Sequence, residues 1–149
     1  MEQESTSNLI GILKNTNEKD IDQYYKQHIE SKSYHSFTAY MDDLIAKKRL
    51  KRQDILARAD IPQKYGYKLL SGESRTSNRD KILRICLAMK LTLTETQRSL
   101  VLYGMHPLYP KNKRDAFLII AINTNMYSIY DINERLVSYG LSELSTSKY

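Results

Sequence analysis

The sequence predicts an all-α fold, and two observations support this. Five Gly and three Pro in 149 residues favour helices over many tight β-turns. Apolar residues also recur at the three-and-four spacing that gives a helix one buried face. The pattern is clearest on both sides of Ala59-Asp60-Ile61, within Leu50–Gly72 (LKRQDILARADIPQKYGYKLLSG). We expect two short helices there, set at an angle, with an apolar inner face and a polar outer face.

Residues 1–34 predict an acidic N-terminal helical extension. A short apolar helix is expected around Leu9–Leu13, and a second helix at about residues 18–29. The second carries a stripe formed by Ile21, Tyr24, Tyr25 and Ile29. These side chains either pack on the rest of the protein or form a surface for a partner or a second copy.

Residues 35–104 predict five helices, of which the first follows Ser36 as its N-cap. Its buried face comprises Phe37, Tyr40, Met41, Leu44 and Ile45. The helix ends in Lys47-Lys48-Arg49, where cations suit the negative end of the helix dipole. The same three cations are also placed to reach a phosphate, and the sequence leaves both roles open.

The second and third helices are expected at 52–59 and from Pro62 to Ser71-Gly72. Proline suits a first helical turn because its φ is already helical and it lacks an N–H that would be unsatisfied there. Glycine at the end supplies the left-handed residue that terminates many helices. A polar loop, 72–78, follows.

The fourth helix is expected at 79–90 with Ser77 or Asn78 as its cap. Its apolar residues are almost continuous, so we expect deep burial, with Cys86 as a small apolar filler and not a nucleophile. Thr94-Glu95-Thr96-Gln97 has the form of a capping box and predicts the start of a fifth helix that ends near Tyr103-Gly104.

Residues 105–149 predict a helical hairpin that repeats the pattern of 79–104. Arg79, Asp80, Leu83, Ile85, Leu100, Val101, Tyr103 and Gly104 recur as Arg114, Asp115, Leu118, Ile120, Leu136, Val137, Tyr139 and Gly140. The offset grows from 35 to 36 residues, which places a one-residue insertion near Tyr127–Tyr130. The second hairpin either serves dimerisation or partner binding, or it completes the core.

Several function classes are disfavoured. The lone Cys86 cannot form an intramolecular disulfide, and the three His are too scattered for a metal-ligand pattern. The richest apolar run, Ala116–Ile122, is far shorter than a membrane span. No phosphate-binding Gly-rich loop or nucleophile motif is present, and adjacent helical carboxylates such as Asp42-Asp43 diverge. We therefore expect a cytoplasmic, non-enzymatic protein without a metal or other cofactor.

Basic charge is concentrated in the middle of the chain. Residues 1–46 hold four Lys and eight acids, residues 47–90 thirteen Lys or Arg and four acids, and residues 91–149 six and five. A solvated helical surface can be moderately basic, but segregation on this scale favours a polyanionic partner.

From about Phe37 to Gly104 the chain resembles the phage-repressor-like helix-turn-helix family, the five-helix module of lambda-type (XRE-type) repressors and Cro. The residues that carry the resemblance are Leu50, Ile55, Ile61, Leu69, Gly72, the apolar helix Ile82–Met89, Leu91 and Leu93. The resemblance implies a DNA-binding domain at 35–104, preceded by the acidic extension 1–34 and followed by the hairpin and tail 105–149.

In that family the second helix of the pair enters the major groove and its exposed N-terminal residues contact bases. The resemblance implies base contacts by Gln63, Lys64, Tyr67 and Lys68. It implies phosphate contacts by Lys48, Arg49, Lys51, Arg52, Tyr65 and Arg75.

Four positions depart from the family pattern. Leu56 stands where Ala is usual, and Gly66 where a buried Ile or Val is usual. Because these positions face each other in the family, we hypothesise a volume exchange in which Gly66 makes room for Leu56. Asp60 replaces the Gly of the turn, although Asp tolerates a left-handed backbone, and Leu70 replaces a commonly acidic residue.

The function that the sequence predicts is a sequence-specific DNA-binding transcriptional regulator of bacterial or phage type, a repressor-like homodimer on double-stranded DNA. The alternative is a protein-binding adaptor or inhibitor that retains the helix-turn-helix shape. Its partner would bind the N-terminal helices or the C-terminal hairpin, where exposed tyrosines suit an interface.

Overall fold

The computed structural model describes residues 10–12, 14, 18–20 and 36–145, and its elements are all helical. Residues 1–35 and 36–149 are separate compact units. In the first unit, residues 10–12 and 14 are helical and Glu18–Asp20 forms a 3₁₀ turn, η1. Most of the expected acidic extension, including the stripe Ile21, Tyr24, Tyr25 and Ile29, lies outside the described residues.

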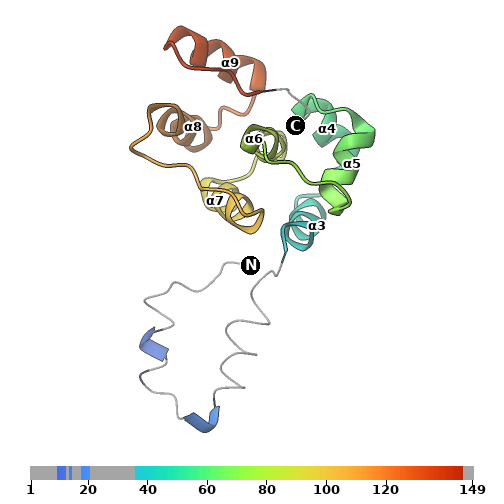
Figure 1. Cartoon of the computed structure of the whole chain (residues 1–149), viewed down its shortest axis with the longest axis vertical. Helices are drawn as coiled ribbons and strands as arrows, with labels where there is room; N and C mark the ends of the chain where they lie inside the picture. Colours follow the sequence, from blue (N-terminus) through green and yellow to red (C-terminus); the bar gives the residue numbers. More distant parts are fainter. Residues whose placement is uncertain (1–9, 13, 15–17, 21–35, 146–149) are drawn as a thin grey trace. The chain divides into compact units, whose positions relative to one another are not determined.

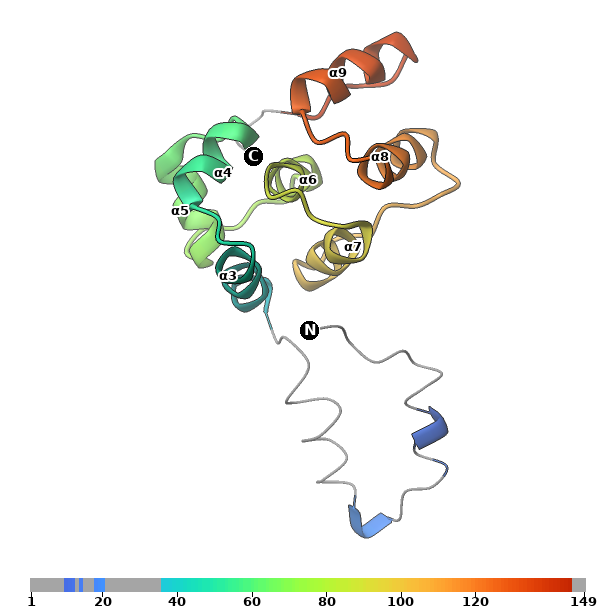
Figure 2. The same ribbon diagram turned by 180° about the vertical axis from the view of Figure 1, so that it is seen from behind.

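The second unit contains helices α3 to α9, with α6 in the middle (Figures 1 and 2). Their bounds are α3 Phe37–Lys47, α4 Arg52–Ala59, α5 Gln63–Ser71, α6 Arg79–Ala88, α7 Leu93–Leu102, α8 Lys113–Asn123 and α9 Ile129–Ser138. Helices α4 and α5 lie on one side of α6, and α8 lies on the other. Every side chain from Lys81 to Met89 is buried. None of the described helices is long and apolar enough to cross a membrane.

Most helix ends match the sequence prediction. Ser36 caps α3 by accepting the N–H of Ala39 on Oγ at 3.1 Å, and the bounds of α4 are those expected. The third helix was predicted to begin at Pro62, but α5 begins one residue later, at Gln63, and Pro62 is its N-cap because its ψ of 132° is extended. Gly72 ends α5 in a left-handed conformation with φ 83°.

Two other predicted helix ends were wrong. The fourth helix ends at Ala88 and not at Lys90, because Lys90 is left-handed (φ 54°) and its N–H bonds to Leu87 O. The capping box of the fifth helix is formed by Thr92 and Glu95, two residues before the expected Thr94. The Thr92 hydroxyl accepts the Glu95 N–H at 3.2 Å, while Glu95 Oε1 accepts the Thr92 N–H at 2.9 Å.

The turn between α4 and α5 depends on Asp60 and Ile61. Asp60 adopts φ 54° and ψ 48°, which is the left-handed conformation that Asp was predicted to tolerate at this position. The N–H of Ile61 then bonds back to Leu56 O at 3.0 Å, and its side chain is buried. The turn therefore fixes the direction in which α5 leaves α4.

Leu56 packs against Gly66, as the hypothesis of a volume exchange requires. Leu56 is 1% exposed, and Gly66 is buried directly against it. A Cβ at Gly66 would lie 2.6 Å from Leu56 Cδ1 and 2.9 Å from Leu56 Cγ, well inside van der Waals contact. The leucine side chain thus fills the space that any side chain at position 66 would need.

The helical hairpin α8–α9 repeats α6–α7 in its backbone geometry. Left-handed residues recur at Lys90 and Asn125 and at Gly104 and Gly140. The hydrogen bonds that close each helix also recur; for example, Leu91 N–H to Cys86 O becomes Met126 N–H to Ala121 O. The N-caps Thr92 and Ser128 are 36 residues apart. The inserted residue is therefore Tyr127, within the range expected.

Two ion pairs cross between the hairpins in a reciprocal manner. Arg79 forms a two-pronged contact with Asp115 (3.1 and 2.5 Å), and Arg114 forms one with Asp80 (3.0 and 2.9 Å). Arg79 and Asp80 are the first two residues of α6, and their equivalents Arg114 and Asp115 are the second and third residues of α8. This exchange is the contact pattern of a two-fold axis, here between two parts of one chain.

The segments that follow α7 and α9 complete the same symmetric arrangement. Arg79 Nη1 donates to the carbonyls of His106 and Pro107, and Arg114 donates to those of Ser142 and Glu143. The backbone N–H groups of Tyr109 and Ser145, 36 positions apart, donate at 2.9 Å to Asp115 and Asp80, respectively. The second hairpin is thus hydrogen-bonded into the same core as the first.

Arg84 ties the end of the second hairpin to α4. It is 3% exposed, and its guanidinium donates to Ala59 O (3.0 Å), Leu144 O (2.7 Å) and Ser145 O (3.0 Å). Burial lowers the pKa of Arg84, while nearby carboxylates, Asp60 foremost, oppose that change. This contact joins the C-terminal segment directly to the turn before α5.

The Leu56→Ala substitution is expected to reduce the free energy of unfolding by about 2 to 5 kcal/mol, because it opens a cavity under α5. Gly66→Val alone should also destabilise, since its side chain overlaps Leu56. The two changes together should lose less than the sum of the single losses, because the new valine occupies the cavity. Denaturant titration of the four proteins measures this coupling. A Leu56→Ala loss below about 1 kcal/mol would refute the exchange of volume.

Asp115→Ala should reduce the free energy of unfolding by about 3 kcal/mol, because it leaves Arg79 without its carboxylate in a largely buried site. A thermal or denaturant cycle with Arg79→Ala should show coupling of about 1 to 3 kcal/mol. The matched control is Asp43→Ala, which breaks the more exposed Lys47–Asp43 pair of α3 (3.0 Å) and should cost less than about 0.5 kcal/mol. Equal small losses at both sites would show that the crossed pairs do not hold the hairpins together.

Candidate nucleic-acid interface

The four predicted base-contacting side chains occupy one region of α5. Gln63, Lys64 and Tyr67 are exposed and Lys68 is half-buried, while Leu69 and Leu70 anchor the helix in the core. Residues four apart share a helix face, so the Gln63–Tyr67 and Lys64–Lys68 pairs form two adjacent rows. The structure therefore places two amines, an amide and a phenol on one outer surface.

Gln63 and Tyr67 also contact each other. Gln63 Nε2 donates a hydrogen bond to the Tyr67 hydroxyl at 2.8 Å, and Tyr67 is 39% exposed. The side-chain amide of Gln63, at the start of the exposed surface of α5, is thus held in one orientation.

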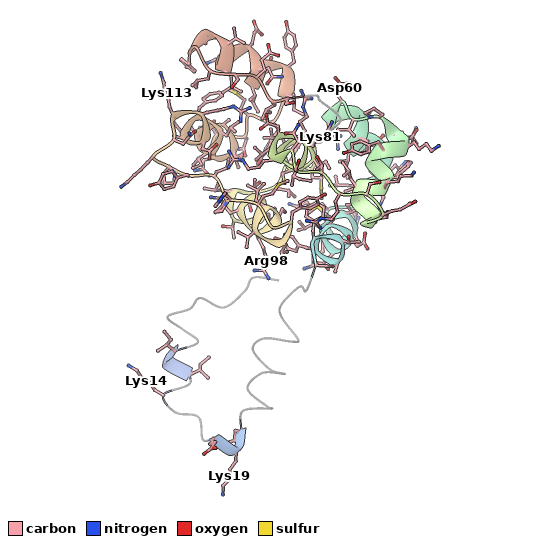
Figure 3. All side chains as sticks on the ribbon, in the orientation of Figure 1. Lys14, Lys19, Asp60, Lys81, Arg98 and Lys113 are labelled. Carbon is pink, nitrogen blue, oxygen red and sulfur yellow. The ribbon has the colours of Figure 1, made fainter. Side chains whose placement is uncertain are left out.

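Tyr65, a predicted phosphate contact, lies on a different side of α5. It is half-buried, and the ammonium of Lys81 lies 5.4 Å from its ring centroid. Lys81 is 1% exposed and comes from α6, as its position in Figure 3 shows. Tyr65 therefore packs toward α6, apart from the four base-contact candidates.

The remaining cations gather around the start of α4 and the end of α3. Lys51 and Arg49 are exposed, and Arg49 has a left-handed backbone with φ 54°. Arg52 Nη2 lies 2.5 Å from Asp42 Oδ1, and Lys48 Nζ lies 3.1 Å from Glu95 Oε1. Two of these four cations are thus engaged by carboxylates, and a phosphate would compete with those carboxylates for them.

Arg75, in the loop after α5, is held by Tyr103. Its guanidinium lies 4.4 Å from the Tyr103 ring centroid and donates to Tyr103 O at 2.8 Å. The Tyr103 hydroxyl in turn accepts the N–H of Thr76 at 2.8 Å. Tyr103 therefore fixes both Arg75 and the loop, a role that the sequence did not indicate.

An open groove of about 950 Å³ lies between the end of α4, the end of α6 and the start of α9. Charged side chains of both signs line it: Arg58, Arg84, Lys90, Asp60, Asp131 and Glu143. The mixture lacks the single sign of charge that would select an anion or a cation. The groove is therefore the weaker candidate for a functional site.

Two chemical features of the described residues concern metal binding and the single cysteine. No group of three or more His, Cys, Asp or Glu in the described part of the chain could hold a metal ion. Burial raises the pKa of the Cys86 thiol to about 12, so a thiolate does not form there near neutral pH. Cys86 is 1% exposed and fills space in the core, in agreement with the sequence prediction.

No protein-family pattern, characterised protein or solved structure matches the chain. Function is therefore inferred from the geometry of α4, α5 and their surroundings.

Proposed function

We propose that the chain is a sequence-specific DNA-binding regulator in which α5 is the recognition helix of a lambda-repressor-like helix-turn-helix domain, α3 to α7. The support is the pair α4 and α5, joined by a turn with left-handed Asp60 and buried Ile61. In such domains the second helix of the pair lies in the major groove while the first crosses the phosphate backbone.

The observation that carries the proposal is the outer surface of α5. Gln63, Lys64 and Tyr67 extend from the first two turns of a helix whose other side is buried. Lys64 and Lys68 suit the O6 and N7 acceptors of guanine, and Gln63 suits the N7 and N6 groups of adenine. These residue types at the N-terminal end of a recognition helix are those that distinguish base pairs.

Cations beside α5 support contacts to phosphates. Lys51 and Arg52 stand at the N-terminus of α4, and Arg49 precedes them. The positive end of the α4 dipole adds to their attraction for a phosphate. These contacts would set the register of the protein on the duplex without selecting sequence.

A homodimer belongs to the same proposal. One domain of this size contacts few base pairs, and family members of this kind bind two half-sites about one helical turn apart. A cytoplasmic repressor of bacterial or phage type is the biological setting that we propose.

The second candidate is a protein-binding adaptor, and exposed apolar side chains on α8 and α9 favour it. Ile120 is 59% exposed, whereas Ile85, its equivalent in α6, is 0% exposed because it packs in the core. Tyr130 and Val137 are also exposed, at 75% and 55%. In this alternative, a protein partner covers these apolar side chains and removes them from water.

The Lys64→Ala plus Lys68→Ala variant should lose selective binding, because each base contact contributes about 1 to 3 kcal/mol of discrimination. Selection of bound sequences from random duplexes first defines the operator of the unaltered protein. Titration then measures affinity for the operator and for an unrelated duplex. We expect the ratio of the two affinities to fall at least about 30-fold in the double variant.

Two further variants serve as controls for this prediction. Lys111→Ala plus Lys113→Ala removes the same charge and should preserve selectivity. Lys113 is the first residue of α8 and lies away from α5 (Figure 3). Arg52→Ala should weaken binding to both duplexes alike. Affinity of the unaltered protein should also fall steeply between about 50 and 200 mM salt. No enrichment of any sequence, with weak binding at low salt, would favour the adaptor.

A further inference from the structure

The hydrogen bond between Gln63 and Tyr67 points to the base that this part of α5 selects. Gln63 is the first residue of α5, and Tyr67 lies one turn later on the same face. Gln63 Nε2 donates to the Tyr67 hydroxyl at 2.8 Å, and both residues are exposed on the proposed DNA-binding surface. The bond therefore acts on a side chain that would meet the bases.

The bond changes what the amide can offer to a base. A glutamine amide has two N–H donors and one carbonyl acceptor. With one N–H directed to Tyr67, one donor and the carbonyl oxygen remain for the duplex. Adenine presents one acceptor, N7, and one donor, N6, in the major groove, so the remaining groups match it.

Guanine presents a different pattern, with two acceptors at N7 and O6. An unrestrained glutamine can turn its two N–H groups toward both. The glutamine held by Tyr67 has only one N–H left, and its carbonyl would face the O6 acceptor. The hydroxyl of Tyr67 thus penalises guanine as well as favouring adenine.

We infer that Tyr67 is a positioning residue that holds Gln63 for adenine and against guanine at one position of each half-site. The inference rests on the proposed function, since it deepens the role of α5. It assigns specificity to a phenol that need not touch the base itself. Because Tyr67 is 39% exposed, its hydroxyl can be removed without opening the core.

Selection with the Gln63→Ala variant first identifies the adenine whose preference depends on Gln63. The test then compares the operator, which has that adenine, with a second duplex in which guanine replaces it. The Tyr67→Phe variant keeps the ring and removes the hydroxyl. We expect its discrimination between the two duplexes to fall about 3- to 10-fold, as expected when an immobilised side chain is released. The fall should combine weaker binding to the adenine duplex with tighter binding to the guanine duplex, and preferences at other positions should stay unchanged.

Two measurements separate positioning from structural damage. Thermal unfolding of Tyr67→Phe should match that of the unaltered protein, and Tyr130→Phe, which alters an exposed tyrosine of α9, should leave the discrimination intact. Unchanged discrimination in Tyr67→Phe, or an equal loss of affinity for both duplexes, would overturn the inference while leaving DNA binding in place. Failure of the unaltered protein to enrich any sequence would overturn the proposed function and the inference together.

Discussion

The crossed ion pairs Arg79–Asp115 and Arg114–Asp80 are the contacts on which the rest of the C-terminal unit depends. Asp115 is 4% exposed, so its charge requires the guanidinium and the Tyr109 N–H that surround it. The two ion pairs join the hairpins α6–α7 and α8–α9 about an internal two-fold axis. Both arginine–aspartate ion pairs form between these two hairpins, so neither is left to bind a further repeat. The pattern therefore suits two copies and not an extended helical array.

The joining of the two hairpins also affects the core on which α5 packs. The second hairpin covers one side of α6, while α4 and α5 cover the other, as Figures 1 and 2 show. Arg84 links the end of the second hairpin to the carbonyl of Ala59, at the end of α4. A glycine inside α5 costs the helix about 1 kcal/mol relative to alanine. Leu56, packed against Gly66, offsets that weakness by filling the site, so the helix that would meet DNA rests on a tight core.

Local patterns in the sequence predicted much of the fold. Apolar spacing and capping residues such as Ser36 and Gly72 defined helices correctly because those signals act within one turn. The Thr94 capping box was wrong because Thr92 offers the same spacing to Glu95, and nothing local distinguishes the two threonines.

The repeated Arg-Asp motif revealed equivalent positions, but equivalence does not show contact, so the pairing of Arg79 with Asp115 was not foreseen. The same holds for Arg75 and Tyr103, which meet only through tertiary packing. The exposure of Gln63, Lys64 and Tyr67 followed from helical periodicity. The four-residue spacing between Gln63 and Tyr67 could have revealed the bond that joins them.

The central claim is that α5 and the start of α4 meet duplex DNA. Chemical-shift mapping of the isotope-labelled full chain during titration with its selected duplex tests this most directly. The account predicts the largest amide shifts at residues 49–52 and 63–68, with residues 113–138 of the second hairpin almost unchanged. Shifts concentrated on α8 and α9, with α5 unaffected, would contradict it.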